Sequence, residues 1–208
     1  MSNYILKHLT QPENQQVIGP IQDDEALLLY ALIRCCRLSN ILEVGGLNGY
    51  SANNFLEATK DTKNSIVVSI DINPIVKLQD RHLTVVKSAS EVTMQDLNSI
   101  VFDLVFFDCH NYEAQLKLFT MLNNNDLLSP TAFLVLHDTN LHPSKITTDS
   151  IQHKDGWIHQ IAERHLANEL HKFGYQVVNF HTSMKVHSTI LPFRHGLTIC
   201  QKYKELKC

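Results

Sequence analysis

Acidic residues and histidines follow two apolar segments in the middle of the chain. The first segment, VFFDCHNYEAQ, places Asp108 and His110 directly after an apolar run. The second, FLVLHDTNLH, places His137, Asp138 and His142 after another. If both runs are neighbouring parallel strands, their carboxyl ends meet at one edge of a sheet. Two carboxylates at that edge could hold a divalent cation that binds a substrate oxygen and lowers its pKa, so both aspartates are candidate metal ligands.

A glycine-rich turn follows an earlier apolar run. In ILEVGGLNGYS, Gly45, Gly46 and Gly49 lie between a short strand and a helix for which Ser51 is the expected N-cap. In a doubly wound sheet, such a turn lets the backbone approach a cofactor. The order of the glycines does not meet the G-x-G-x-x-G pattern of dinucleotide-binding proteins. A nucleotide-dependent oxidoreductase is therefore a disfavoured alternative, and failure to bind NAD(H) in a fluorescence titration would exclude it.

The segments that position these residues alternate between the periods of strands and helices. The apolar strands suggest burial on both faces, as in a parallel sheet. No helical pattern separates the last two strands, which predicts an antiparallel pair at one edge. We expect one α/β domain over residues 1–208, with a doubly wound, seven-stranded and mostly parallel sheet whose last strand is antiparallel. Strands are expected over residues 40–46, 65–73, 82–90, 101–108, 132–138, 175–181 and 195–203, and helices over 23–38, 51–59, 91–100, 112–124 and 156–174.

Two segments fall outside this alternation. Residues 1–20 are expected to form an N-terminal extension, and residues 139–156 a loop over the site. A connection of that length is more often functional than decorative, which makes it a candidate substrate lid. We expect the last helix to end at Gly174, and its histidines to lie at the surface or at its boundary.

The composition limits the classes of partner. The 208 residues carry a formal net charge of -3 and have no basic run, which argues against a nucleic-acid surface. No stretch approaches the roughly 20 apolar residues of a membrane helix. The five cysteines have neither CxxC spacing nor the pattern of a disulfide framework. We therefore expect a soluble, cytoplasmic protein that binds a small molecule.

The stretch LEVGGLNGYS resembles the first motif, E-x-G-x-x-x-G-Y-S, of class I S-adenosylmethionine-dependent methyltransferases. It is most similar to the small-molecule O-methyltransferase branch, which includes catechol and caffeoyl-CoA O-methyltransferases and has a Rossmann-like fold. The resemblance implies that Glu43 and the backbone at Gly45 and Gly49 line the methionine end of the cofactor, with Tyr50 and Ser51 closing the pocket. Such a zwitterionic group needs a carboxylate for its ammonium and helix-start donors for its own carboxylate.

The same resemblance, which covers roughly residues 20–203, implies an adenosine site. Asp71, at the end of the second strand, would accept the ribose hydroxyls, and Ile72 would pack on the adenine. Ser88 and Ala89 fall where the family has its adenine-edge loop. Ser88 could instead cap the helix expected after it.

The metal site departs from the family pattern at one position. Catechol-type relatives bind magnesium through an Asp after strand four and an Asp-Asn pair after strand five. The corresponding residues here are Asp108, which would also face the cofactor, Asp138 and Thr139. A threonine hydroxyl is a weaker ligand than an amide carbonyl, so binding of Mg²⁺ or another divalent cation is left open.

The catalytic base departs from the pattern as well. Catechol-type enzymes have a lysine three residues after the strand-four Asp, where this chain has Asn111. A histidine can take a hydroxyl proton near neutral pH, which makes His110 the first candidate and His142 the second. His137 could orient the neighbouring ligand from behind.

These residues predict S-adenosylmethionine-dependent O-methylation of a small-molecule hydroxyl, with Asp108 and Asp138 orienting the acceptor. Because two family positions are altered, a catalytically inactive, methyltransferase-like binding protein remains the main alternative. No motif identifies the acceptor. A homodimer is also compatible with the sequence, because the segment before Gly19 could pack on a partner.

Overall fold

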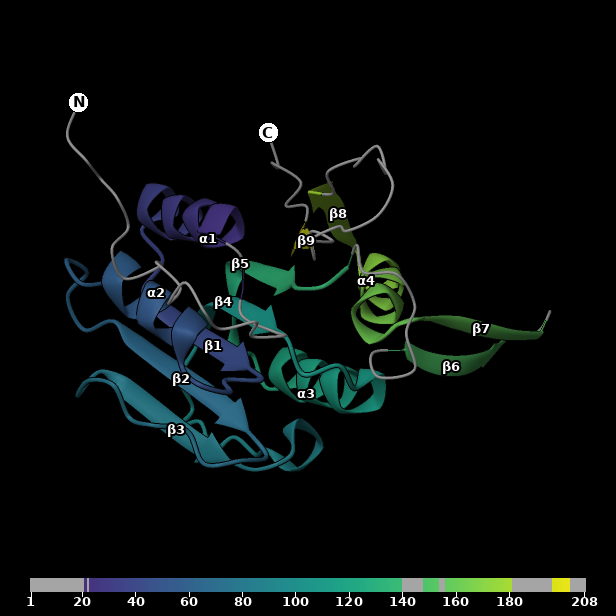
Figure 1. The fold of residues 1–208 in the computed structure, drawn as a ribbon, viewed down its shortest axis with the longest axis horizontal. Helices are drawn as coiled ribbons and strands as arrows, with labels where there is room; N and C mark the ends of the chain where they lie inside the picture. The colour runs from purple at the N-terminus through teal and green to yellow at the C-terminus, as the bar shows by residue number, and fades with distance from the viewer. Residues whose placement is uncertain (1–20, 22, 140–147, 154–155, 181–195, 203–208) are drawn as a thin grey trace, which may run out of the picture.

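The computed structural model describes residues 21, 23–139, 148–153, 156–180 and 196–202. Seven strands form one sheet in the order β3-β2-β1-β4-β5-β9-β8 (Figure 1). Strands β1 to β5 pair in parallel, whereas β9 is antiparallel to both β5 and β8, as the sequence predicted. The strands are β1 Asn40–Val44, β2 Ile66–Asp71, β3 His82–Val86, β4 Phe102–Phe107, β5 Leu128–Leu136, β8 Tyr175–Phe180 and β9 Leu197–Lys202.

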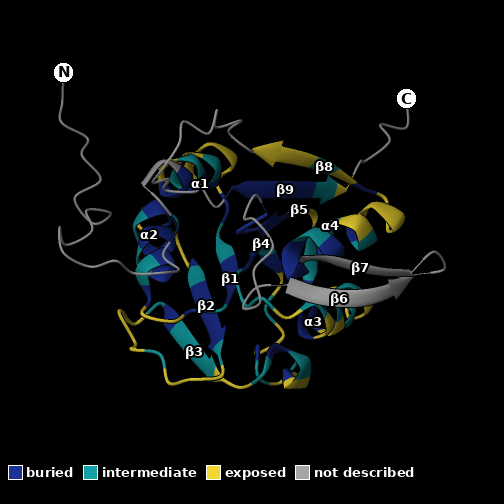
Figure 2. Cartoon of the chain, turned by 45° about the vertical axis from the view of Figure 1, so that its right-hand side comes forward, coloured by how far each residue is buried: buried dark blue, intermediate teal, exposed yellow. Residues whose placement is uncertain are grey.

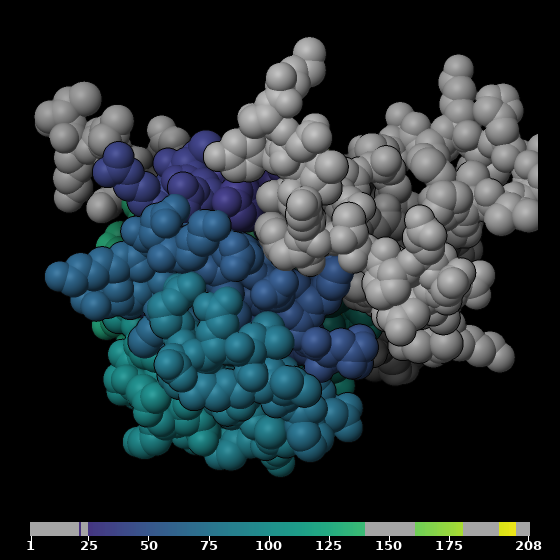
Figure 3. Space-filling view, turned by 60° about the vertical axis from the view of Figure 1, so that its left-hand side comes forward, coloured from purple at the N-terminus to yellow at the C-terminus, as the bar shows by residue number. Residues whose placement is uncertain are grey.

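Helices cover both faces of this sheet. Helices α1 (Asp23–Cys36) and α2 (Tyr50–Ala58) pack on one face, and α3 (Tyr112–Asn124) and α4 (Ala162–Lys172) on the other (Figure 1). In the space-filling view, α1 and α2 lie above the segments around β2 and β3 (Figure 3). None of the described helices is both long and apolar enough to cross a membrane.

The core consists of two layers because successive side chains of a strand point to opposite faces of the sheet. Ile41 and Phe106 belong to the layer with α1 and α2, and their neighbours Leu42 and Val105 belong to the layer with α3 and α4. Buried residues therefore fill the central strands on both sides (Figure 2). This burial explains the near-continuous apolar strands of the sequence.

Two predicted helices differ in the structure. Residues 156–161, predicted as helix, form strand β7 (Gly156–Ile161), which pairs antiparallel with β6 (Thr148–His153) in a separate two-stranded sheet. Part of the predicted lid loop is thus a hairpin, and it extends beside α4 (Figure 1). Cross-strand pairing outweighs the local helical pattern here, and β-branched and aromatic residues favour it. Residues 91–100 contain only the end of the 3₁₀ helix η2 (Ala89–Glu91) and turns.

The end of α4 follows the prediction in one respect and differs in another. Gly174 follows the C-cap of this helix with φ +81°, the left-handed conformation expected of a glycine there. His165, expected at the surface or boundary, is buried and packs its ring against Tyr112 at 5.4 Å between centroids. The predicted N-terminal extension, residues 1–20, lies outside the described part of the chain.

The ends of the central strands position the candidate site. Val44 at the end of β1 pairs with Phe107 at the end of β4, which pairs with Leu136 at the end of β5. The three strands therefore end level with one another. Their following residues, including Asp108 and His137, meet at one edge of the sheet, as the sequence predicted.

Candidate active site

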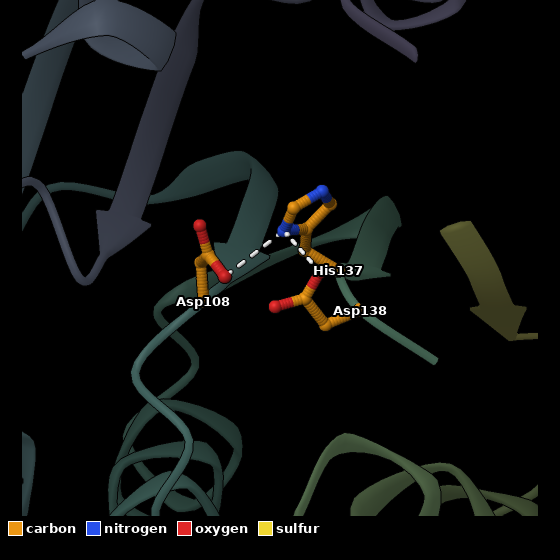
Figure 4. Close-up of side chains that lie close together, drawn as sticks. All are labelled: Asp108, His137 and Asp138. Atoms are coloured by element: carbon orange, nitrogen blue, oxygen red, sulfur yellow. Dashed lines mark hydrogen bonds and ion pairs between the residues drawn. The ribbon is translucent and has the colours of Figure 1, made fainter. Parts of the chain in front are cut away.

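A buried imidazole links the two candidate carboxylates (Figure 4). His137 Nδ1 lies 3.0 Å from Asp108 Oδ1 and 3.3 Å from Asp138 Oδ1, and Nε2 lies 3.1 Å from Oε2 of Glu25 in α1. Burial disfavours the charged imidazole, but the surrounding carboxylates outweigh it and raise the pKa of His137 well above its usual range. Burial also raises the pKa of Asp108. In this arrangement His137 is a cation that joins three acidic side chains.

His110 approaches the same carboxylates from the loop before α3. Its Nε2 lies 3.3 Å from Asp138 Oδ2 and 3.7 Å from Asp108 Oδ1, and its Nδ1 lies 3.2 Å from Glu163 Oε1. Burial lowers the pKa of His110, but the hydrogen bond and charge of Glu163, together with the two aspartates, raise it to about 9. The predicted base is therefore protonated at pH 7. His110 and Asp138 both have a left-handed backbone, with φ +50° and +58°, a conformation that costs energy in a non-glycine residue and that often occurs at functional sites.

The glycine turn packs directly against this loop. Gly45 has φ +98°, and a Cβ added to it would lie 2.3 Å from the backbone oxygen of Asp108. The N-cap of α2 is Gly49, with φ +76° and no side-chain cap, so the prediction that Ser51 caps this helix is wrong. Because Tyr50 already begins the helix, Ser51 lies inside its first turn. Because Gly49 has no side chain to cap this helix, backbone N–H groups at its start can donate to an anion such as the carboxylate of a cofactor.

Glu43 lies beneath the glycine turn and is fully buried. Its carboxyl oxygens accept hydrogen bonds from the hydroxyls of Ser51 and Ser69, and Ser69 Oγ lies 2.9 Å from His82 Nε2. A Cβ added to Gly46 would lie 3.2 Å from Glu43 Oε2. Burial raises the pKa of Glu43 to about 7, although the two hydroxyls oppose this effect. Glu43, the residue predicted to line the cofactor pocket, is thus held under the glycine turn by Ser51 and Ser69.

Asp71 lies at the end of β2 and holds the glycine turn. Its Oδ2 accepts from the backbone N–H of Leu47 at 2.9 Å, and its Oδ1 accepts from Asn73 N at 2.8 Å. Asn73 Nδ2 also donates to Oδ1 at 3.4 Å. Because a carboxylate can accept about four hydrogen bonds, capacity remains on Oδ2 for one ribose hydroxyl. The neighbouring Ile72 is 72% exposed, which leaves an apolar side chain available to an adenine.

The turn, Asp71 and the carboxylate pair all fall within one recognised segment. Residues 42–139 match the methyltransferase-domain family. The sequence resemblance is thereby confirmed for this segment. Among curated proteins, none matches the chain in sequence.

Several solved structures of methyltransferases share the fold of this chain. A candidate caffeoyl-CoA O-methyltransferase from Staphylococcus aureus has a TM-score of 0.61 at 19% identity, over 89% of this chain and 86% of that chain. The SAH-bound methyltransferase PaMTH1 of Podospora anserina has a TM-score of 0.58 at 18% identity, over 86% and 78%. The SAM complex of TomG, an O-methyltransferase of tomaymycin synthesis from Streptomyces achromogenes, has a TM-score of 0.54 at 14% identity, over 89% and 82%. These likenesses show the Rossmann-like methyltransferase fold.

The two residues predicted to border the adenine, Ser88 and Ala89, follow β3. The hydroxyl of Ser88 accepts from Ser90 N at 3.4 Å and caps η2, which is the structural alternative that the sequence left open. Ala89 is buried at the start of that turn. Their contact with a cofactor remains a prediction.

The two altered family positions have structural roles. The hydroxyl of Thr139 accepts from Thr198 Oγ1 at 2.9 Å and is buried, so it bonds to β9. The side chain of Asn111 accepts from Ala114 N at 2.9 Å and caps α3. Neither residue therefore replaces its family counterpart at the carboxylates. His142 lies outside the described residues.

The carboxylate pair and His137 form a donor set that fits a divalent cation. Asp108, His137 and Asp138 each offer one ligand atom, and these atoms lie within 4.8 Å of one another. Two carboxylates and an imidazole suit Mn²⁺, Fe²⁺ or Zn²⁺, whereas Mg²⁺ prefers oxygen ligands alone. Glu25 bonds the other nitrogen of His137, as carboxylates commonly do for metal-binding histidines. The third ligand would then be His137, through Nδ1 once this nitrogen has released its proton, instead of the residue at the family's asparagine position.

Two acidic residues of the site were not predicted. Glu25 and Glu163 contact the histidines across 112 and 53 residues of sequence. Glu25 did carry a signal, because it lies four residues before Leu29 and eight before Ile33, on the buried stripe of α1. An acidic residue in phase with an apolar stripe indicates a buried partner. Glu163 carried no such signal, because its segment was assigned to the interior of a longer helix.

Proposed function

We propose that this chain transfers a methyl group from S-adenosylmethionine to a hydroxyl of a small molecule. The observation that carries the proposal is the contact between the glycine turn at Gly45 and the loop at Asp108, which also bears the carboxylate pair. A cofactor on the turn would present its methyl group beside Asp108 and Asp138. The methyltransferase-domain match and the fold shared with SAM-bound and SAH-bound enzymes support this reading.

Different residues around the glycine turn would bind different parts of the cofactor. The start of α2 would bind the methionine carboxylate, with Glu43 beneath it and Tyr50 and Ser51 at its edge. Asp71 would bind the ribose, and Ile72 would pack on the adenine. The bound cofactor supplies a methyl group already activated by its sulfonium, so positioning provides most of the rate acceleration. Ser88 and Ala89 would border the adenine.

Asp108 and Asp138 would orient the acceptor hydroxyl, directly or with a divalent cation. Such a cation, held with the help of His137, would lower the pKa of the hydroxyl. Positive charge beside the two aspartates would also weaken their hold on the His110 proton. This lowers the pKa of His110 toward the range that a general base requires, while the bond and charge of Glu163 still favour its protonated form.

Calorimetric titration of S-adenosylmethionine and S-adenosylhomocysteine tests the cofactor assignment. Asp71→Asn is the sharper variant, because alanine would also remove the acceptor of Leu47 N, whereas asparagine keeps one oxygen for it. We expect wild-type protein to bind and Asp71→Asn to bind at least about tenfold more weakly, since hydrogen bonds to charged groups contribute about 1.5–3 kcal/mol. The exposed Asp126→Asn is the matched control. No binding by the wild type, with Mn²⁺ or Mg²⁺ or with chelator, would refute the proposal.

A screen of hydroxyl acceptors separates the enzyme from the main alternative. Formation of S-adenosylhomocysteine with any phenol, sugar or other hydroxyl compound supports the enzyme. Tight cofactor binding without product from any acceptor would favour a catalytically inactive binding protein. The altered family positions Thr139 and Asn111 are the observation that keeps this second candidate.

Compartment and assembly are part of the proposal as well. Cys35, Cys36, Cys109 and Cys200 are free thiols in the described part of the chain, which favours a reducing compartment such as the cytoplasm. A homodimer stays a prediction, which light scattering of the purified chain would test.

A further inference from the structure

Glu163 holds both the backbone and the ring of His110. This glutamate lies in the first turn of α4 and is fully buried. Its Oε1 accepts from the backbone N–H of His110 at 3.0 Å and lies 3.2 Å from Nδ1 of the same residue. Gln115 Nε2 donates to the same oxygen at 2.7 Å. One carboxylate oxygen thus contacts two groups of the candidate base.

The rest of the carboxylate contributes little to stability. Glu163 Oε2 is buried and has no hydrogen-bond partner among the described residues. Burial of a charged oxygen without a partner is costly. A neutral side chain of the same shape would fill the position at lower cost. We therefore attribute the presence of a carboxylate at this position to the contacts of Oε1 with the backbone N–H and Nδ1 of His110.

The contact also explains an unusual backbone conformation. His110 has φ +50°, which a non-glycine residue adopts only when its surroundings impose it. The bond from its N–H to Glu163 stabilises this turn. In the same geometry, Nε2 faces Asp138 at 3.3 Å and Asp108 at 3.7 Å. Anchoring one ring nitrogen fixes the direction of the other.

We propose that Glu163 is a positioning residue that anchors the backbone N–H and the Nδ1 edge of His110 and so directs Nε2 toward the acceptor beside Asp108 and Asp138. Gln115 in turn holds the carboxylate in place. The assignment rests on the proposed function, in which His110 accepts the hydroxyl proton. The bonds that Glu163 makes go to His110 and Gln115, so its proposed effect on the acceptor acts through His110.

Proton NMR of the wild-type protein tests the contact without any turnover. An imidazole N–H that donates to a buried carboxylate gives a strongly downfield signal, which exchanges slowly with water. We expect such a signal from His110 Nδ1–H, identified by its loss in His110→Gln, while signals from His137 persist. It should shift upfield in Glu163→Gln and disappear in Glu163→Ala. Absence of the signal from the wild type, or no change in either Glu163 variant, would overturn the proposal.

Kinetics then separates positioning from a structural role. For Glu163→Gln we expect kcat to fall about 10- to 100-fold, the usual effect of losing a group that orients an imidazole, with an unchanged dissociation constant for S-adenosylmethionine. Glu113→Gln, in the exposed first turn of α3, is the matched control and should retain wild-type kcat. An unchanged kcat in Glu163→Gln, or equal losses in kcat and cofactor binding, would refute positioning. A chain with the NMR signal but no turnover would refute only the proposed function.

Discussion

Replacement of Glu43 by glutamine should stabilise the protein, and the gain should depend on pH. Glu43 is fully buried, and its pKa is raised from 4.5 to about 7. Between these values the native state keeps a proton that the unfolded state releases, so stability falls as pH rises from about 4.5 to about 7. The difference of about 2.5 between the pKa values corresponds to about 3 kcal/mol, at about 1.36 kcal/mol for each pH unit.

Glu43→Gln removes this cost because the amide never ionises. The amide can still accept from one serine, and it can donate to the oxygen of the other. At pH 8 we therefore expect the variant to be more stable than wild type by up to about 3 kcal/mol, or about 6 to 12 °C in Tm for a chain of this size. Near pH 4.5 the two proteins should differ little.

Urea unfolding from pH 4.5 to 9 measures this difference. Subtracting the wild-type free energy of unfolding from that of Glu43→Gln cancels the contributions of the other titrating groups. The difference should rise through pH 5 to 7 and then level off. A flat difference for Glu43→Gln would refute the raised pKa and the reasoning from burial.

Three further predictions concern the turn and the carboxylates. Gly45→Ala should lower the free energy of unfolding by more than about 3 kcal/mol, because strain at positive φ adds to a clash with the backbone of Asp108. Gly174→Ala should lower it by about 1–2 kcal/mol, because an added Cβ there has nothing within 4 Å. Equal losses of Tm would contradict this. His137→Gln should lower the free energy of unfolding by about 3–5 kcal/mol, because it leaves buried carboxylates uncompensated. The control His171→Gln, at an exposed position, should change it by less than about 0.5 kcal/mol. A small effect at His137 would show that its contacts with the carboxylates are weak. Mn²⁺ should raise Tm of the chelator-treated protein more than Mg²⁺ does, and equal shifts would argue against an imidazole ligand.

Local patterns predicted most of the fold. The bounds of α3 agree with the predicted helix because its apolar spacing and its cap at Asn111 lie within the segment itself. That the strands before Asp108 and Asp138 are parallel neighbours followed from short apolar strands joined by helices. The prediction of a helix over residues 156–161 was wrong because pairing with β6, not the periodicity of the segment itself, decides its conformation. A strand that pairs outside the main sheet is hard to predict from its local sequence pattern.

The site divides in the same way. Asp108 and Asp138 could be placed together because they lie one and two residues after strands that end at the same edge. The reach of His137 to Glu25, and of His110 to Glu163, depends on how α1 and α4 pack, and no local pattern records that packing. The protonated state of His110 could not be predicted either, because Glu163 is one of the groups that raise its pKa.

The bond of Glu25 to Gly196 affects the order in which the chain can complete its site. While Oε2 of this glutamate holds His137, its Oε1 accepts from the N–H of Gly196 at 2.7 Å, a contact that spans 171 residues. During synthesis, β4 and β5 leave the ribosome well before this glycine does. Contacts of such sequence separation form late, since they require closure of a long loop. A nascent chain that already contains residues 42–139 would therefore still lack one of the bonds that hold Glu25 against the imidazole. The carboxylate cluster would be complete only when the last strand joins the sheet.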